Sequence, residues 1–175
     1  ISANTTWAKA NSPFLVTGDV TVNSGKTLTI EAGSEVRFTP LSDDQSSGED
    51  QNRPELTVKG TLIANGTASD TIVFTSNAES PASGDWYGIY LRDNSASGSF
   101  KYNRIEYATY GVRSYSLYGS TSDTIRVTNS RIHHSGTGIY SDNSYRYEIY
   151  EDNNLHDLSG NGIYMGWGQN GSGIV

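Results

Sequence analysis

The sequence contains no cysteine and only one methionine. The lack of cysteine excludes a disulfide framework and zinc sites of the CxxC type. There is no run of about 18 apolar residues, so we expect no membrane insertion. Basic residues are also scarce, because 12 Lys and Arg stand against 19 Asp and Glu, for a formal net charge of −7. Nucleic-acid binding depends on neutralising phosphates with Lys and Arg, and we therefore expect no nucleic-acid partner.

Apolar residues make up only 34% of the chain, less than is usual for a globular domain. No stretch sustains an apolar pattern with the 3.6-residue period of a helix, whereas alternation with period two is common. The 19 Gly and 12 Tyr, together with many Ser, Thr and Asn, are typical of short strands joined by tight turns. The period-two alternation and this composition predict an all-β chain. The low apolar content fits a fold whose core is a thin column.

A repeat runs through the second half of the chain. A glycine followed by an apolar residue recurs every 23 to 27 residues, at Gly88-Ile89-Tyr90, Gly111-Val112-Arg113, Gly138-Ile139-Tyr140 and Gly162-Ile163-Tyr164. In step with it, a small polar residue precedes an apolar one by two positions, in the pairs Asn103 and Ile105, Ser130 and Ile132, Asn153 and Leu155. Repeats of this length must stack on their neighbours to bury their apolar faces. The pattern predicts a right-handed, single-stranded parallel β-helix (a β-solenoid) of six or seven rungs.

We expect residues 1–175 to form a single domain, with residues 1–13 as an N-terminal cap. Four segments interrupt the rhythm and are interpreted as surface excursions at turns: Pro40 to Pro54, Asn77 to Asp85, Leu117 to Asp123 and Asp142 to Arg146. No amphipathic or charged segment covers the last rung, and Ile174 and Val175 resemble the start of a further strand. An open solenoid end exposes apolar core and strand edges. We therefore expect a longer natural chain, or a partner that docks on the last rung.

Three stretches resemble a known family. Residues 12–22 (SPFLVTGDVTV) and 27–38 (TLTIEAGSEVRF) look like the N-terminal portion of bacterial and archaeal cell-surface proteins built as right-handed parallel β-helices, and residues 152–164 (DNNLHDLSGNGIY) are similar to the repeat of that family. The resemblance implies a fold related to that of pectate lyases and a secreted or cell-surface location. Because the group also holds polygalacturonases, epimerases, phage tailspikes and non-catalytic adhesins, it does not select an activity.

Alternation along the repeated strands predicts which side chains face outward. Ile89, Leu91, Val112, Ser114, Ile139, Ser141, Ile163 and Met165 are expected inside, and a ladder of aromatic and charged side chains outside. Aromatic rings stack on the C–H faces of sugars, and Arg pairs with carboxylates. The ladder predicts binding of an acidic polysaccharide, with Tyr90, Arg92, Tyr115 and Tyr164 as carbohydrate-binding residues. The alternative is that these residues only clad the sheet, because Tyr–Tyr and Tyr–Arg pairs stabilise strands unaided.

A second outward column is expected at Glu106, His133 and His156, beside Tyr107, His134 and Asp157. These histidines are candidates for acid–base chemistry or for metal binding, with solvent-facing polar residues as the alternative. A different cation site is predicted in the acidic insert, where Asp43, Asp44, Glu49 and Asp50 are candidate Ca²⁺ ligands. The alternative is a solvated acidic loop.

The leading function is extracellular recognition or processing of a polysaccharide that contains uronic acid. If the chain is an enzyme, we expect a polysaccharide lyase or a glycoside hydrolase, with Arg113, Tyr140, Asp142 and His133 as catalytic residues. A lyase needs the substrate carboxylate neutralised and a base beside it, and a hydrolase needs two carboxyl groups at a set distance. The rival hypothesis is a non-catalytic adhesin or a structural spacer.

Overall fold

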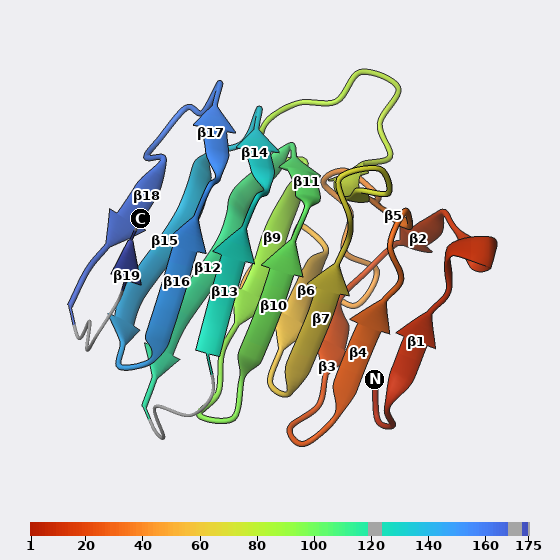
Figure 1. Ribbon diagram of the computed structural model, residues 1–175. Coiled ribbons are helices and arrows are strands. Elements are labelled where there is room, and N and C mark those ends of the chain that lie inside the picture. Colours follow the sequence, from red (N-terminus) through yellow and green to blue (C-terminus); the bar gives the residue numbers. More distant parts are fainter. Residues whose placement is uncertain (119–123, 168–172, 175) are drawn as a thin grey trace.

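The computed structural model describes residues 1–118, 124–167 and 173–174, which form a stack of rungs with three parallel sheets (Figure 1). Each complete rung contributes one strand to each sheet, in the order A, B, C. Sheet A contains β1 (Thr5–Trp7), β4 (Thr27–Ile30), β7 (Thr61–Asn65), β10 (Ser97–Lys101), β13 (Thr124–Thr128), β16 (Tyr147–Glu151) and β19 (Gly173–Ile174). Six complete rungs and the first strand of a seventh confirm the predicted parallel β-helix.

The other two sheets have six strands each. Sheet B contains β2 (Phe14–Val16), β5 (Glu35–Phe38), β8 (Ile72–Ser76), β11 (Asn103–Glu106), β14 (Arg131–His133) and β17 (Asn154–His156). Sheet C contains β3 (Val20–Val22), β6 (Glu55–Val58), β9 (Trp86–Leu91), β12 (Ala108–Leu117), β15 (Thr137–Ser144) and β18 (Ile163–Met165). A 3₁₀ turn, η1 (Lys9–Asn11), is the only helical element in the described ranges, which contain no helix long and apolar enough to cross a membrane.

The core is a set of apolar columns, because residues in register on successive rungs point to the same side of their sheet. On sheet B one column runs through Phe14, Val36, Phe74, Ile105, Ile132 and Leu155. The side chains that alternation placed inside, from Ile89 to Ser141, are buried, including Ser114 and Ser141. Towards the C-terminal rungs the interior becomes polar: the fully buried Glu148 accepts hydrogen bonds from the hydroxyls of Ser114, Ser144 and Tyr150.

The small polar residues of the repeat form a ladder inside the corner between sheets A and B. The backbone N–H of Asn103 donates to Ser130 Oγ, and that of Ser130 donates to Asn153 Oδ1, each at 3.0 Å. Each of the three follows a residue with left-handed backbone, namely Tyr102, Asn129 or Asp152. One residue in this conformation turns the chain sharply, and the ladder then satisfies the backbone groups that the corner would leave unpaired.

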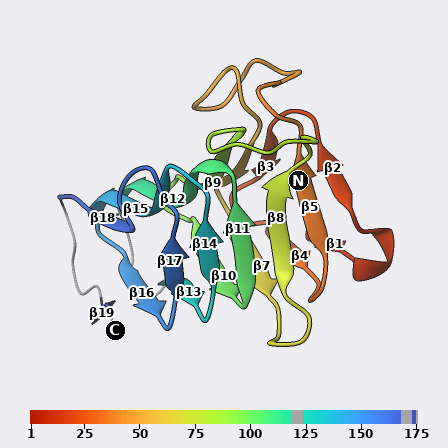
Figure 2. The same ribbon diagram turned by 90° about the horizontal axis from the view of Figure 1, so that it is seen from above.

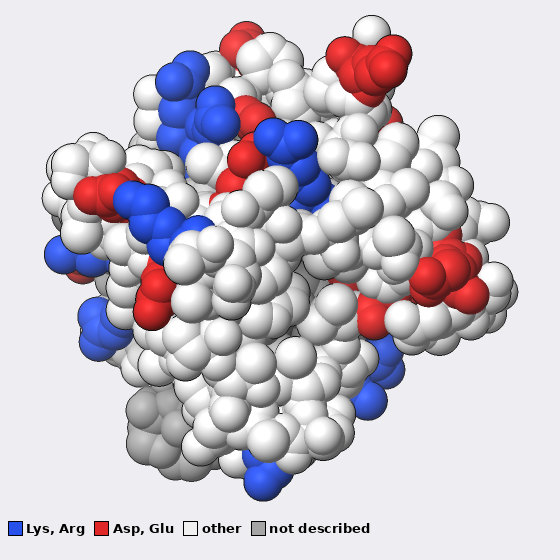
Figure 3. Space-filling model, turned by 90° about the vertical axis from the view of Figure 1, so that its right-hand side faces the viewer, with Lys and Arg blue, Asp and Glu red and all other residues white. Residues whose placement is uncertain are grey.

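The first residues contribute a strand to the first rung in addition to covering its end. β1 pairs with β4, and the ring of Trp7 stacks on that of Phe14, with 4.8 Å between centroids. Figure 3 looks onto this end of the stack, and uncharged side chains cover most of it, with the charged ones gathered towards its margin. Ile1 and Trp7 pack against the core from this segment, and its role as a cap stays a prediction.

Two of the predicted excursions, residues 40–54 and 77–85, connect sheet B to sheet C and lie side by side (Figure 2). The N–H of Leu41 donates to the carbonyl of Asp85, and Arg53 Nε donates to that of Gly84. The prediction for residues 142–146 was wrong in its first part, because Asp142 to Ser144 continue β15 in register with β12. Leu117 is likewise the last residue of β12, and residues 119–123 of that excursion lie outside the described ranges.

Candidate functional site

The predicted ladder lies on the outer face of sheet C. Tyr90, Arg113, Tyr140 and Tyr164 occupy one column of paired positions on four successive rungs. Tyr115 and Asp142 are paired in the next outward column. The rings of Tyr140 and Tyr164 stack with centroids 4.6 Å apart. The register therefore confirms that these side chains form a ladder on one face.

Arg113 lies at the centre of a group of tyrosine rings. Its guanidinium carbon is 4.6 to 5.7 Å from the ring centroids of Tyr87, Tyr90, Tyr110, Tyr115 and Tyr140. Its Nη1 also donates to the hydroxyl of Tyr87. Burial lowers the pKa of this guanidinium, but the neighbouring phenols and the carboxylate of Glu49 outweigh burial and raise it. Arg113 is a buried cation whose charge is stabilised by the tyrosine rings, a phenol hydroxyl and a carboxylate instead of by water.

The acidic insert supplies the counter-ion. Glu49 Oε1 is 3.2 Å from Nη1 of Arg113, and Glu49 Oε2 is 3.8 Å from Nη1 of Arg92. The insert folds over the N-terminal half of this face, where Tyr90 is only 2% exposed. The two arginines of the ladder therefore share one carboxylate that comes from a different part of the chain.

The four candidate calcium ligands have separate protein partners. Asp43 accepts N–H groups from Gln45 and Ser47, Asp44 accepts the hydroxyl of Thr17, and Asp50 pairs with Arg53 at 2.6 Å. Glu49 binds the arginines. In the part of the chain that the structure describes, no three His, Asp or Glu side chains are placed to hold a metal ion. The structure does not bring Asp43, Asp44, Glu49 and Asp50 together as one ligand set.

A hollow opens beside the insert at the carboxyl ends of the sheet C strands. Its volume is about 360 Å³, and it is lined by Glu49, Lys59, Tyr90, Arg92, Asp93, Tyr115 and Ser116. Three of the four predicted carbohydrate-binding residues, Tyr90, Arg92 and Tyr115, line it, and Tyr164 does not. Asp93 has φ of 111°, a conformation that residues other than glycine rarely adopt and that often marks functional sites.

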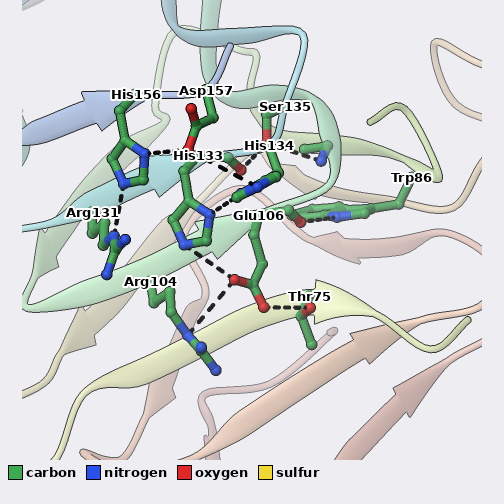
Figure 4. Close-up of polar contacts among 11 residues, drawn as sticks. Thr75, Trp86, Arg104, Glu106, Arg131, His133, His134, Ser135, His156 and Asp157 are labelled. Carbon is green, nitrogen blue, oxygen red and sulfur yellow. Dashed lines mark hydrogen bonds and ion pairs between the residues drawn. The ribbon is translucent and has the colours of Figure 1, made fainter. Parts of the chain in front are cut away.

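The predicted catalytic residues lie on two different sheets. Arg113, Tyr140 and Asp142 are on sheet C, where the hydroxyl of Tyr140 donates to Asp142 Oδ2 at 3.3 Å. His133 is on the outer face of sheet B, in the cluster shown in Figure 4. Its Nε2 lies 3.2 Å from Glu106 Oε2, and its Nδ1 lies 2.5 Å from Nδ1 of His134. Nδ1 of His133 therefore contacts His134, whereas the buried Nε2 lies near the Glu106 carboxylate without a hydrogen bond.

The second predicted column is present, and two of its three members are stacked imidazole rings. Glu106, His133 and His156 are in register, and the imidazoles of His133 and His156 lie parallel with centroids 5.0 Å apart. Glu106 Oε1 accepts the hydroxyl of Thr75 at 2.8 Å. Burial lowers the pKa of His133, while the carboxylate of Glu106 opposes that shift. His133 and Glu106 are the buried members of a cluster whose other members, such as His134 and Asp157, are exposed.

Comparison with protein families matches residues 1–96 to the pectate-lyase-like β-helix domain. The chain belongs to this family. Comparison with curated proteins gives no match, and neither does comparison with solved structures. Within this pectate-lyase-like domain the matched residues include the acidic insert, Glu49 and the strand that carries Tyr90.

Two features of the site in this β-helix domain were not predicted. Tyr87 contributes a hydroxyl to Arg113, and burial raises its pKa. Lys59 lines the hollow from the turn after β6. Alternation along β9 points both Tyr87 and Tyr90 outward only if Gly88 interrupts the pattern, and Gly88, at φ 139°, does so. Gly88 was the sequence signal that could have predicted an outward Tyr87.

Proposed function

We propose that this chain recognises an acidic polysaccharide through the hollow on the outer face of sheet C. The observation that carries the proposal is the convergence of Arg92, Lys59 and Tyr115 on one hollow of about 360 Å³. Arg92 and Lys59 supply positive charge to a carboxylate, and Tyr115 supplies an aromatic surface to a sugar ring. Tyr90 is too deeply buried for stacking and forms the floor.

Recognition is better supported than bond cleavage. A lyase needs a free cation beside a free base, whereas Arg113 is engaged by Glu49 and Tyr87, and His133 lies on a different sheet, in contact with His134. Asp142 accepts hydrogen bonds from the Tyr140 hydroxyl and from the backbone N–H of Trp167. The role we propose is therefore that of a binding module on a secreted or cell-surface protein, which is where such polysaccharides are found.

The test compares binding of polygalacturonate and of a neutral galactan to the wild-type chain and to the double variant Arg92→Gln/Tyr115→Ala. A charge-assisted hydrogen bond contributes about 1.5–3 kcal/mol, so we expect the variant to bind polygalacturonate at least about tenfold more weakly. Arg126→Gln is the matched control, because Arg126 is an exposed arginine on sheet A.

The same samples are followed for absorbance near 235 nm and for new reducing ends, with and without Ca²⁺. Binding without either signal supports a recognition module. Equal binding by the double variant would remove the hollow from consideration, and unsaturated or reducing ends would show an enzyme. No binding to any acidic polysaccharide would favour the structural spacer.

A further inference from the structure

The outer face of sheet B carries two columns of mainly polar and charged side chains that the proposed function does not use. Glu35, Val73, Arg104 and Arg131 are in register in one column. The neighbouring column contains Arg37, Thr75, Glu106, His133 and His156. This face is separate from the hollow on sheet C.

Arg104 and Arg131 are in register on adjacent rungs, where strands lie about 4.8 Å apart. Two like charges on directly paired positions repel one another. Arg104 Nε lies 3.8 Å from Glu106 Oε2, which is beyond hydrogen-bond distance, and that carboxylate is already shared by Thr75 and His133. No carboxylate of the described residues lies within 4.0 Å of the Arg131 guanidinium. The pair therefore carries more positive charge than its surroundings neutralise.

The side chains around the pair hold it in place. Arg131 Nε donates to His156 Nε2 at 2.8 Å, and Nδ1 of His156 is 2.8 Å from Asp157 Oδ2. This chain of contacts fixes Arg131 and leaves its two terminal amino groups without an acceptor among the described residues. Figure 4 shows Arg104 and Arg131 on the same side of the histidine cluster, away from Trp86. An arginine held in advance loses less entropy when it binds an anion.

A hollow of about 380 Å³ lies against both arginines, lined by Thr71, Val73, Tyr102, Asn103, Arg104, Asn129 and Arg131. Its lining combines an apolar side chain, an aromatic ring, the amide of Asn129 and two guanidinium groups, whereas the amide of Asn103 is buried in the corner. A small-molecule pocket has this composition: mostly non-ionic walls with a few polar groups that fix orientation. The volume suits a single sugar ring or a molecule of similar size.

We propose that this hollow is a second binding site, for a small hydroxylated carboxylate such as an acidic monosaccharide. The carboxylate lies between Arg104 and Arg131 and accepts charge-assisted hydrogen bonds from both. The ring of the ligand lies against Val73 and Tyr102, and its hydroxyls contact the side-chain amide of Asn129. The site depends on neither Arg92 nor Tyr115, so it stands or falls separately from the proposed function.

The test is a titration of the ¹⁵N-labelled chain with galacturonic acid, followed by amide chemical shifts. We expect saturable shifts at Tyr102, Arg104 and Arg131, and a dissociation constant that rises about tenfold or more in Arg104→Gln and in Arg131→Gln. Arg126→Gln on sheet A is the matched control and should bind as the wild type does. Arg104→Gln removes no partner of the Arg131–His156 contact, so a loss in that variant does not come from release of Arg131.

Galactose and inorganic phosphate are the comparison ligands. Galactose, which lacks the carboxylate, should cause no saturable shift at these amides. If phosphate binds as tightly as galacturonate, the proposal of a sugar-acid ligand is overturned and the hollow is a simple oxyanion site. Galacturonate shifts confined to the region of Arg92 and Tyr115, or no shifts at all, would overturn the second site.

Discussion

Replacing Glu49 with Gln should lower the stability of the protein and, at the same time, strengthen the binding of an acidic polysaccharide to the ladder. Glu49 is the only carboxylate within 4.0 Å of the Arg113 guanidinium among the described residues, and it also lies near Arg92. Glutamine keeps the shape and one acceptor oxygen and removes the charge. The substitution therefore leaves the Arg113 cation with phenol rings, one phenol hydroxyl and a neutral amide oxygen in place of the carboxylate.

The magnitude follows from the exposure of the two partners. The side chain of Arg113 is 11% exposed and that of Glu49 is 37% exposed. Removing one partner of a fully buried pair costs about 3–5 kcal/mol, whereas exposed pairs contribute about 0.2–1 kcal/mol. Because one partner is partly solvated and glutamine can still accept a hydrogen bond, we expect a loss of about 2 kcal/mol. For a chain of this length, that loss lowers the melting temperature by about 4–8 °C.

The assay is a double-mutant cycle on thermal unfolding with Glu49→Gln, Arg113→Gln and the double variant. Asp44→Asn is the control, because it removes one charge from the same insert, and Asp44 contacts a threonine hydroxyl rather than an arginine. The same Glu49→Gln protein should bind polygalacturonate more tightly, since the carboxylate that competes for Arg92 is gone. A coupling energy below about 0.5 kcal/mol, or equal losses for Glu49→Gln and Asp44→Asn, would refute the assignment.

Three further predictions concern pH, packing and calcium. Burial raises the pKa of Glu55 above its ordinary value of 4.5, although a hydrogen bond from Thr57 opposes the shift. The contribution of Glu55 to stability is therefore complete below about pH 4 and is lost as pH rises. Glu55→Gln should flatten the resulting fall in melting temperature, measured in a series from pH 3.5 to 7. The rings of Phe38 and Trp86 stack with centroids 3.9 Å apart in the core, so Phe38→Ala should cost about 3–5 kcal/mol by denaturant unfolding, against about 0.5 kcal/mol or less for Leu15→Ala, whose side chain is exposed. Because Asp43, Asp44, Glu49 and Asp50 already have protein partners, we expect a chelator to leave the melting temperature unchanged, and a clear rise on adding Ca²⁺ would show instead that the insert binds the ion.

The fold could be predicted because its information is local and repeated. Ile105, Ile132 and Leu155 are spaced by one rung, and each rung places them in the same core column. The register of the glycine repeat was less regular than its sequence suggests. Gly88 pairs with Tyr110, and the ladder is irregular between Tyr110 and Val112. The spacing of the repeat does not reveal one additional residue in a strand, because the turns between sheets vary in length.

The corners explain the second column as well. Strict alternation fails where Tyr107, His134 and Asp157 adopt left-handed backbone, with φ of 64°, 51° and 51°. Each forms the turn after a strand of sheet B and stands beside the outward Glu106, His133 or His156. The column itself could be predicted from the period, but the contacts of its side chains could not. Which nitrogen faces which neighbour depends on rotamers that spacing does not determine.

The burial and ion pairing of the ladder side chains could not be predicted, because they depend on residues far away in the sequence. Alternation correctly points Tyr90 and Arg113 outward, and an outward side chain is then expected to meet solvent. Instead the insert, which enters between β5 and β6, brings Glu49 onto Arg113 across 64 positions. The buried Arg113 neutralises Glu49, and the insert leaves Arg92 as the ladder's more accessible cation, with a side chain 43% exposed. The acidic insert and the basic ladder are therefore one electrostatic unit, and the affinity of this face for an acidic ligand depends on how firmly Glu49 holds its two arginines.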